Sequence, residues 1–384
     1  MTLRESPGSR PDGSRPDGTV TAAAGAAACG TDGRTVTGHP HRRRDRRDRR
    51  AGRAWAELLR LPALFSVPGD ALAGTAAAGG SPGPRTLLAI GSSLCLYEAG
   101  MALNDWADRD VDAVERPHRP LPSGRIRPSA ALTAACALTA AGLALAARAG
   151  RPALTVAAPL AATVWAYDLG LKHTPAGPVA MGAARGLDLL LGAAASAGRT
   201  SRALPSAALL GTHIVAVTTV SRQEAQGGSP LAPLAALATT ALLTRLLTHR
   251  SAGPATDRSQ TTGHGPTDPR PARNQPGPTD PRPARNQPGP TDPRPARNQP
   301  RQASAELLTA ACAAAYAATT ARPYVHATLN PSPPLTQRAV GAGIRATIPL
   351  QAALTARSRG TAGALLIAAL APLGARFAKK VSVT

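Results

Sequence analysis

Aromatic residues are scarce in this sequence of 384 residues: it holds two Phe, four Tyr and three Trp, although 43% of its residues are hydrophobic. A soluble core of that size normally draws on more aromatic side chains to fill its volume. Ala, Leu and Val supply almost all of the hydrophobicity instead. The length allows two or three soluble domains or one polytopic membrane domain with tails, and the composition favours the membrane domain.

Cysteine is scarce as well. The four cysteines, Cys29, Cys95, Cys136 and Cys312, lie far apart and have neither the spacing of a metal site nor that of a redox pair. We interpret the last three as small apolar residues within helices.

Acidic residues are half as numerous as basic ones, with 22 Asp and Glu against 44 Lys and Arg and a net charge of +22. Such an excess can indicate a nucleic-acid partner. Much of the charge lies in two polar segments, however, and the remainder flanks apolar stretches without interleaved aromatic residues. The sequence therefore predicts no nucleic-acid partner.

Two segments are predicted to be disordered, because neither can bury enough apolar surface to offset its ordering entropy. Residues 1–52 form a basic tail that includes the run HRRRDRRDRR (His41–Arg50), and residues 251–303 form a Pro-rich insertion that repeats GPTDPRPARNQP three times. The arginine run either attracts anionic lipid head groups or only marks the cytoplasmic side. The remaining domain comprises residues 53–250 and 304–384.

This domain carries a series of apolar stretches, several of which approach the roughly 20 residues that span a bilayer as a helix. Their Ala and Gly content suits close helix contacts in lipid. The series predicts an all-α polytopic bundle of nine or ten transmembrane helices in the cell membrane. We expect the helices at about residues 55–78, 86–104, 129–148, 152–169, 178–197, 203–221, 230–248, 304–321, 336–356 and 361–377.

Basic residues in the short loops set the expected orientation. The arginine run places the N-terminus in the cytoplasm, and the second apolar stretch returns the chain to that side. There it delivers NDWADRDVDAVERPHRPLPSG, Asn104–Gly124, in which four aspartates lie within eight positions.

This aspartate segment has helical spacing. Because residues four apart share one face of a helix, Asn104, Asp108 and Asp112 are expected to form a single stripe, with Asp105 close by. Carboxylates stacked in this way repel one another unless they share a cation, and oxygen ligands completed by water and phosphate are what Mg²⁺ prefers. The alternative is a solvated acidic helix end. Ionisable residues near the end of a membrane helix are costly, however, unless they line a polar cavity.

Asn104-Asp105-x-x-Asp108-x-x-x-Asp112 followed by ERPHRPLPSG resembles the first signature of the UbiA superfamily of intramembrane prenyltransferases. The resemblance implies a membrane helix bundle with a polar, Mg²⁺-containing chamber that opens to the cytoplasm. It also implies transfer of a prenyl group from an isoprenyl diphosphate to an acceptor. In that scheme Asn104, Asp108 and Asp112 hold Mg²⁺ on the diphosphate, and Asp105 lies nearby.

Cationic side chains can support the departing diphosphate, and Arg116, Arg119 and Lys172 are the candidates. Lys172 belongs to YDLGLKHT, which resembles the family's Tyr…Lys element with one additional residue between Tyr167 and the lysine. The alternative for Lys172 is an ion pair with Asp168 on the surface of a helix.

The family's second acidic motif is reduced in this chain. The corresponding place reads VSRQEAQGG, in which Arg222 is a further diphosphate-binding candidate and Glu224 is the only acid. Three interpretations are open: one Mg²⁺ is bound, Glu224 holds a second ion with help from Asp188, or the protein binds diphosphates poorly. An aspartate within an apolar stretch is a functional candidate, and the alternative for Asp188 is an ion pair with Arg185.

Two other functions remain open at this point. Polytopic helices with buried acids also build transporters, and the reduced second motif is compatible with a UbiA-like protein that has no catalytic activity. The sequence does not predict the length of the prenyl chain or the identity of the acceptor.

Overall fold

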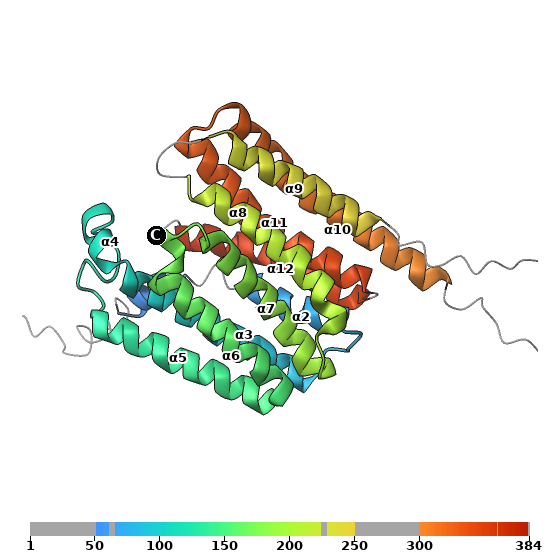
Figure 1. The fold of residues 1–384 in the computed structure, drawn as a ribbon, viewed down its shortest axis with the longest axis horizontal. Helices are drawn as coiled ribbons and strands as arrows, with labels where there is room; N and C mark the ends of the chain where they lie inside the picture. Colours follow the sequence, from blue (N-terminus) through green and yellow to red (C-terminus); the bar gives the residue numbers. More distant parts are fainter. Residues whose placement is uncertain (1–50, 61–65, 224–228, 250–298, 359, 383–384) are drawn as a thin grey trace, which may run out of the picture. The chain divides into compact units, whose positions relative to one another are not determined.

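The computed structural model describes residues 51–60, 66–223, 229–249, 299–358 and 360–382, and all regular elements within these ranges are helices, as predicted. After a helical segment at residues 51–58, the elements are α2 Val67–Ala77, α3 Pro84–Ala107, α4 Arg109–Glu115, α5 Pro128–Ala149, α6 Arg151–Leu169, the 3₁₀ turn η2 Leu171–His173, α7 Gly177–Ala197, the 3₁₀ turn η3 Ser201–Ala203, α8 Leu204–Ser221, α9 Leu231–Thr248, α10 Gln299–Leu329, α11 Pro333–Arg357 and α12 Thr361–Ser382 (Figure 1).

Five of the described helices are long and apolar enough to cross a membrane: α3, α5, α7, α9, and α8 together with the turn before it. One predicted boundary is wrong, because the stretch at residues 55–78 is not one helix. The helical segment ends at residue 58 and α2 begins at Val67. Between them Arg60 has a left-handed backbone with φ of 48°, a conformation that a continuous right-handed helix does not contain.

The predicted tail, residues 1–52, and the predicted insertion, residues 251–303, lie mostly outside the described residues. Residues 51 and 52 are helical, and α10 begins at Gln299. The helices therefore extend a few residues into both segments, where Ala and Gln favour helix formation.

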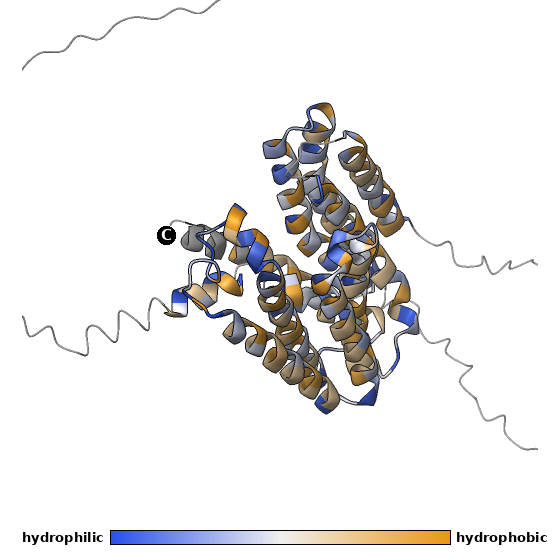
Figure 2. Cartoon of the chain, turned by 60° about the vertical axis from the view of Figure 1, so that its left-hand side comes forward, coloured by the Kyte–Doolittle hydropathy of each residue, from blue (hydrophilic) through white to orange (hydrophobic). Residues whose placement is uncertain are grey.

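Proline and glycine set many of the helix boundaries. Proline occupies the first turn of α3, α5, α6, α7, α8 and α11, where its missing N–H costs no helical hydrogen bond. Gly150 alone joins α5 to α6, and Gly198 ends α7 with φ of 68°. Figure 2 shows hydrophilic residues at the connections and mainly apolar ones along the helices between them.

Close packing against α7 holds α2 in the bundle. A Cβ added at Gly74 would lie 1.8 Å from the Leu189 carbonyl oxygen, and one at Gly192 would lie 2.2 Å from that of Ala71. Only glycine permits this approach of two backbones, which small residues allow in lipid. The Thr75 hydroxyl also donates to the Gly192 carbonyl at 3.3 Å.

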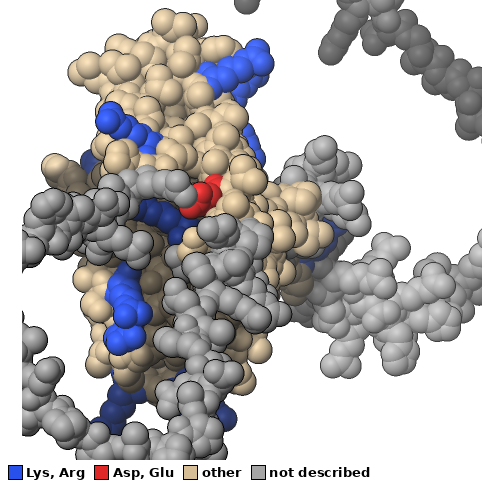
Figure 3. Space-filling model, turned by 90° about the vertical axis from the view of Figure 1, so that its right-hand side faces the viewer, with Lys and Arg blue, Asp and Glu red and all other residues tan. Residues whose placement is uncertain are grey.

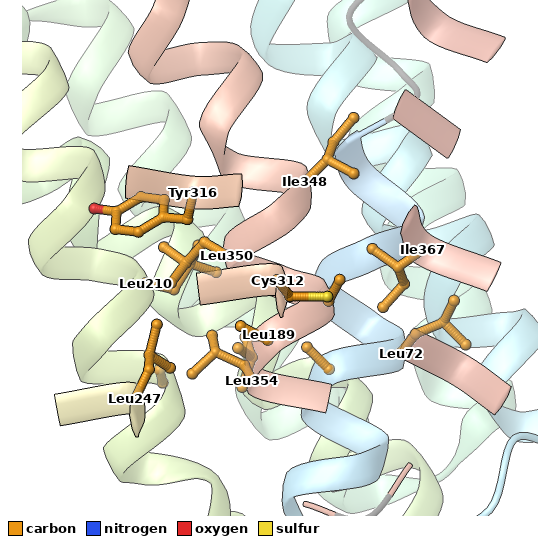
Figure 4. Close-up of a cluster of buried hydrophobic side chains, with 14 of the residues drawn as sticks. Leu72, Leu189, Leu210, Leu247, Cys312, Tyr316, Ile348, Leu350, Leu354 and Ile367 are labelled. Atoms are coloured by element: carbon orange, nitrogen blue, oxygen red, sulfur yellow. The ribbon is translucent and has the colours of Figure 1, made fainter. Parts of the chain in front are cut away.

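Apolar side chains from α2, α7, α8, α9, α10, α11 and α12 meet in one cluster, in which Leu210 and Leu350 are drawn on the side of Tyr316, and Leu72 and Ile367 on the opposite side (Figure 4). On the face in Figure 3, basic side chains are scattered over the surface and acidic ones show only in a small area.

Candidate functional site

The aspartate segment spans the junction of α3 and α4. The backbone N–H of Asp108 donates to Asn104 at 2.9 Å, that of Asp112 to Asp108 at 2.8 Å, and that of Arg116 to Asp112 at 2.8 Å. These four-residue steps are those of an α-helix. The predicted spacing of one helical turn is therefore kept across the junction.

Lys172 contacts two of the three ligands predicted for the first Mg²⁺. Its Nζ lies 2.6 Å from Asp108 Oδ1 and 3.3 Å from Asn104 Oδ1. The lysine comes from η2, directly after α6, and its side chain is only 9% exposed. Lys172 thus contacts the aspartate segment instead of forming the surface pair with Asp168. We call Asn104, Asp108 and Lys172 the lysine group.

Asp112 belongs to a different set of contacts, which we call the arginine group. Arg119 Nη1 lies 2.6 Å from Asp112 Oδ2 and 3.5 Å from Asp105 Oδ1, and Arg116 Nη1 lies 3.9 Å from Asp112 Oδ1. The expected single stripe is therefore divided. Its cause is the backbone of Asp108, whose ψ of 3° departs from the helical value and turns α4 relative to α3.

The donor atoms of the lysine group suit a hard cation. Two oxygens, one amide and one carboxylate, converge on a single positively charged nitrogen, and Mg²⁺ needs only one or two protein carboxylates when water and phosphate complete its shell. Within the described residues, no set of three or more His, Cys, Asp or Glu side chains is arranged to hold a metal. Asn104 and Asp108 thus fit Mg²⁺, whereas Asp112 is paired with arginine.

A cavity of about 250 Å³ opens beside the lysine group, between α3, α6 and α7. Asn104, Tyr167 and Asp168 line one end of it, and Ser93, Arg185 and Asp188 line the other. Ser93 and Asn104 are eleven residues apart on α3, which is roughly 16 Å along a helix axis. Apolar side chains line the stretch between the ends: Leu96, Met101, Leu160, Val164 and Met181.

The candidates Asp188 and Arg222 do not join the lysine group. Asp188 Oδ1 accepts a hydrogen bond from the Ser93 hydroxyl at the inner end of the cavity. Arg222 is exposed and donates to the carbonyl of Thr174, directly after η2, which places it at the same end of the bundle as Lys172. Glu224 lies outside the described residues.

The UbiA prenyltransferase family matches this chain over residues 68–249, which include both groups and the whole cavity except Arg60. Residues 68–249 form a UbiA prenyltransferase family domain. Homologues of this domain are named prenyltransferases.

Three similar proteins illustrate the match. Digeranylgeranylglyceryl phosphate synthase of Methanopyrus kandleri is 36% identical over 128 residues, or 32% of this chain and 45% of the relative. Protoheme IX farnesyltransferase of Acidiphilium cryptum is 36% identical over 152 residues, or 38% and 47%. This chain therefore spans about half the length of the curated relatives it matches. The structure of an Archaeoglobus fulgidus UbiA homolog bound to DMAPP and Mg²⁺ has a TM-score of 0.42 and 19% identity, covering 50% of this chain and 76% of that one.

Two further functional candidates, Arg60 and Asp70, were not predicted from the sequence. Arg60 Nη2 lies 3.3 Å from Asp105 Oδ1, and Arg185 Nη2 lies 2.8 Å from Asp70 Oδ2, so that Arg185 pairs with Asp70 and not with Asp188 as its expected partner. Arg60 and Asp70 are charged residues in the apolar stretch at residues 55–78. An ionisable residue inside such a stretch is a functional candidate by default, and this signal identifies both.

Proposed function

We propose that this protein transfers a prenyl group from an isoprenyl diphosphate to an acceptor within the membrane, in a reaction that depends on Mg²⁺. The lysine group carries the proposal. It brings a buried cation and two oxygen ligands to one end of a cavity whose middle stretch is apolar. The family match over residues 68–249 supports it.

In the lysine group, the ammonium of Lys172 can exchange one anionic partner, the Asp108 carboxylate, for another, a diphosphate. Lys172 contacts Asp108 at 2.6 Å, and its ammonium is free to contact diphosphate oxygens instead once a divalent cation compensates the carboxylate. Bound Mg²⁺ supplies charge neutralisation for the departing diphosphate. Asn104 and Asp108 would hold the ion, and Lys172 would hold the diphosphate.

The arginine group extends the positive surface next to the lysine group. Arg116 is 52% exposed, and Arg119 already spans two carboxylates. Preorganised cations lower the free energy of the charge that develops on the leaving group. We assign both arginines, with Arg222 at the same end of the bundle, to diphosphate binding.

The cavity suits the reacting carbon. Breaking an allylic C–O bond leaves a carbocation, and water would capture it. Leu96, Leu160 and Val164 line the cavity between Asn104 and its inner end, and an apolar wall excludes water from that stretch. We place the opening of this chamber on the cytoplasmic side, following the basic loops.

The test uses the full chain purified in detergent, a lipid extract as the source of acceptor, and a panel of allylic diphosphates. Diphosphate release should require Mg²⁺, and Asp108→Asn should lower it by a factor of roughly 10² to 10³, because it removes a charge that is needed in the transition state. The matched control is Asp110→Asn, two positions along the same segment, whose side chain is 84% exposed. It should behave as the unsubstituted chain.

Normal turnover by Asp108→Asn contradicts the proposal. Diphosphate binding without any release identifies a UbiA-like protein that has no catalytic activity, and solute flux in vesicles without diphosphate chemistry identifies a transporter.

A further inference from the structure

Five polar side chains from four helices gather at the inner end of the cavity, and we call them the inner polar cluster. They come from α2, α3, α7 and α11, and all except Arg185 are at least nine-tenths buried. Its members are Asp70, Ser93, Arg185, Asp188 and Gln351.

The inner polar cluster has two layers. Ser93, Arg185 and Asp188 line the cavity. Behind them, Asp70 pairs with Arg185 at 2.8 Å and accepts a hydrogen bond from Gln351 Nε2 at 2.6 Å. The rear layer fixes the guanidinium, and the Ser93 hydroxyl fixes the carboxylate of Asp188. Side chains held by such second contacts are typical of a preorganised binding site.

The charges of the cluster determine which ligand it suits. Arg185 carries its only positive charge, and two carboxyl groups, Asp70 and Asp188, interact with that charge and with each other. The cation is therefore already neutralised, and a second anion would have to enter without compensation, which is unfavourable in a buried site. A group that both donates and accepts hydrogen bonds suits the front layer, because Arg185 donates and Asp188 accepts.

The position of the cluster agrees with a ligand other than the prenyl chain. A hydrocarbon tail that reached the inner end would leave Ser93, Arg185 and Asp188 without polar partners on the cavity side, and such desolvation is costly. The whole cavity measures about 250 Å³ and must also hold the reacting end of the prenyl group, so its inner end has room only for a compact head group.

We propose that the inner polar cluster binds a neutral, hydroxylated group of the acceptor substrate. This inference rests on the proposed function, because it assigns one part of the same cavity to the acceptor. The guanidinium of Arg185 donates a hydrogen bond to the oxygen of the bound hydroxyl group. The same hydroxyl group donates a hydrogen bond to the carboxylate of Asp188. Acceptors that carry a carboxylate or a phosphate at this position are excluded by charge.

The experiment measures binding to the full chain in detergent by calorimetry, without any prenyl diphosphate. The probes are benzyl alcohol and benzoate, which have similar size, carry a single polar group each and differ in charge. The unsubstituted chain should bind the alcohol at least roughly tenfold more tightly, which corresponds to the loss of one hydrogen bond to a charged group. Asp188→Asn should narrow or reverse this preference, because it removes one of the two carboxyl groups that neutralise Arg185.

Two further variants keep the test decisive if Asp188→Asn fails to fold. Ser93→Ala keeps every charge, so the affinities for both probes should fall together, roughly fivefold, and the preference should persist. Glu98→Gln alters another buried carboxyl group of α3, one that does not line the cavity. It should leave both affinities unchanged.

Equal affinity for the two probes, or no binding of the alcohol by the folded chain, overturns the inference. The same holds if a folded Asp188→Asn keeps the full preference. If the chain releases diphosphate in the activity test but shows no preference for the alcohol in calorimetry, the proposed function stands and the acceptor site is rejected. A preference without release rejects the proposed function and leaves a site for a neutral hydroxylated ligand.

Discussion

The two ends of the cavity use the same residue types for different chemistry. At the outer end, Lys172 and Arg119 each contact two oxygen-bearing side chains of the aspartate segment, and Arg116 is half exposed. At the inner end, the only cation is enclosed with two carboxyl groups. At the outer end the three cations of the lysine and arginine groups face three aspartates, which suits exchange of a carboxylate for another anion. At the inner end one cation faces two carboxyl groups, which suits an uncharged ligand. The ratio of cations to carboxyl groups, more than residue type, separates the two ends.

The largest expected effect is a loss of stability when the inner polar cluster loses its cation. Arg185→Met should lower the free energy of unfolding by about 3–5 kcal/mol, because it leaves Asp70, which is 0% exposed, as a buried charge without its partner. Unfolding in detergent, followed by circular dichroism, measures the loss. The matched control is Arg125→Met, which breaks the exposed ion pair with Glu57 and should change stability by about 1 kcal/mol or less. Equal losses of stability in the two variants would contradict the claim that the buried pair of Arg185 with Asp70 differs from an exposed ion pair.

The next effect concerns the outer end. Lys172→Met should lower diphosphate release roughly a hundredfold, because one preorganised cation is lost at the leaving group. Stability should change little, since Asp108 remains partly accessible to water. Initial rates at saturating and limiting Mg²⁺ check this prediction. A variant with unaltered rates would show that the contact with Asp108 is only structural.

The smallest effect belongs to Arg116. Its Nη1 lies 3.9 Å from Asp112 and its side chain is 52% exposed, so the ion pair is weak and screened. Arg116→Ala should therefore reduce diphosphate release less than about fivefold, and more so at low salt than at high salt. A salt-independent loss as large as that of Lys172→Met would place Arg116 inside the reaction chamber.

Local patterns predicted much of the fold and part of the site. Apolar stretches predicted the long helices from α3 onward within the described residues, because this signal acts over a few neighbouring positions. The turn spacing of Asn104 and Asp108 was predicted for the same reason. The basic loops predicted Lys172 on the same surface as the aspartate segment, whereas its contacts with Asn104 and Asp108 are seen only in the structure.

The remaining contacts depend on information that spacing does not hold. The pair of Asp70 with Arg185 joins residues far apart in the chain, and one sequence does not reveal which buried charge faces which. The division of the aspartate segment depends on the backbone angle at Asp108, and no residue pattern indicated that turn. The break at Arg60 was missed because apolar residues continue on both sides of it.

Binding of an unreactive analogue tests the role of the outer end most directly. The full chain should bind geranyl thiolodiphosphate in calorimetry only when Mg²⁺ is present, Asp108→Asn should abolish that binding, and Glu98→Gln should preserve it. Binding that is equally strong without Mg²⁺, or that persists in Asp108→Asn, would contradict the assignment of Asn104, Asp108 and Lys172 to the diphosphate.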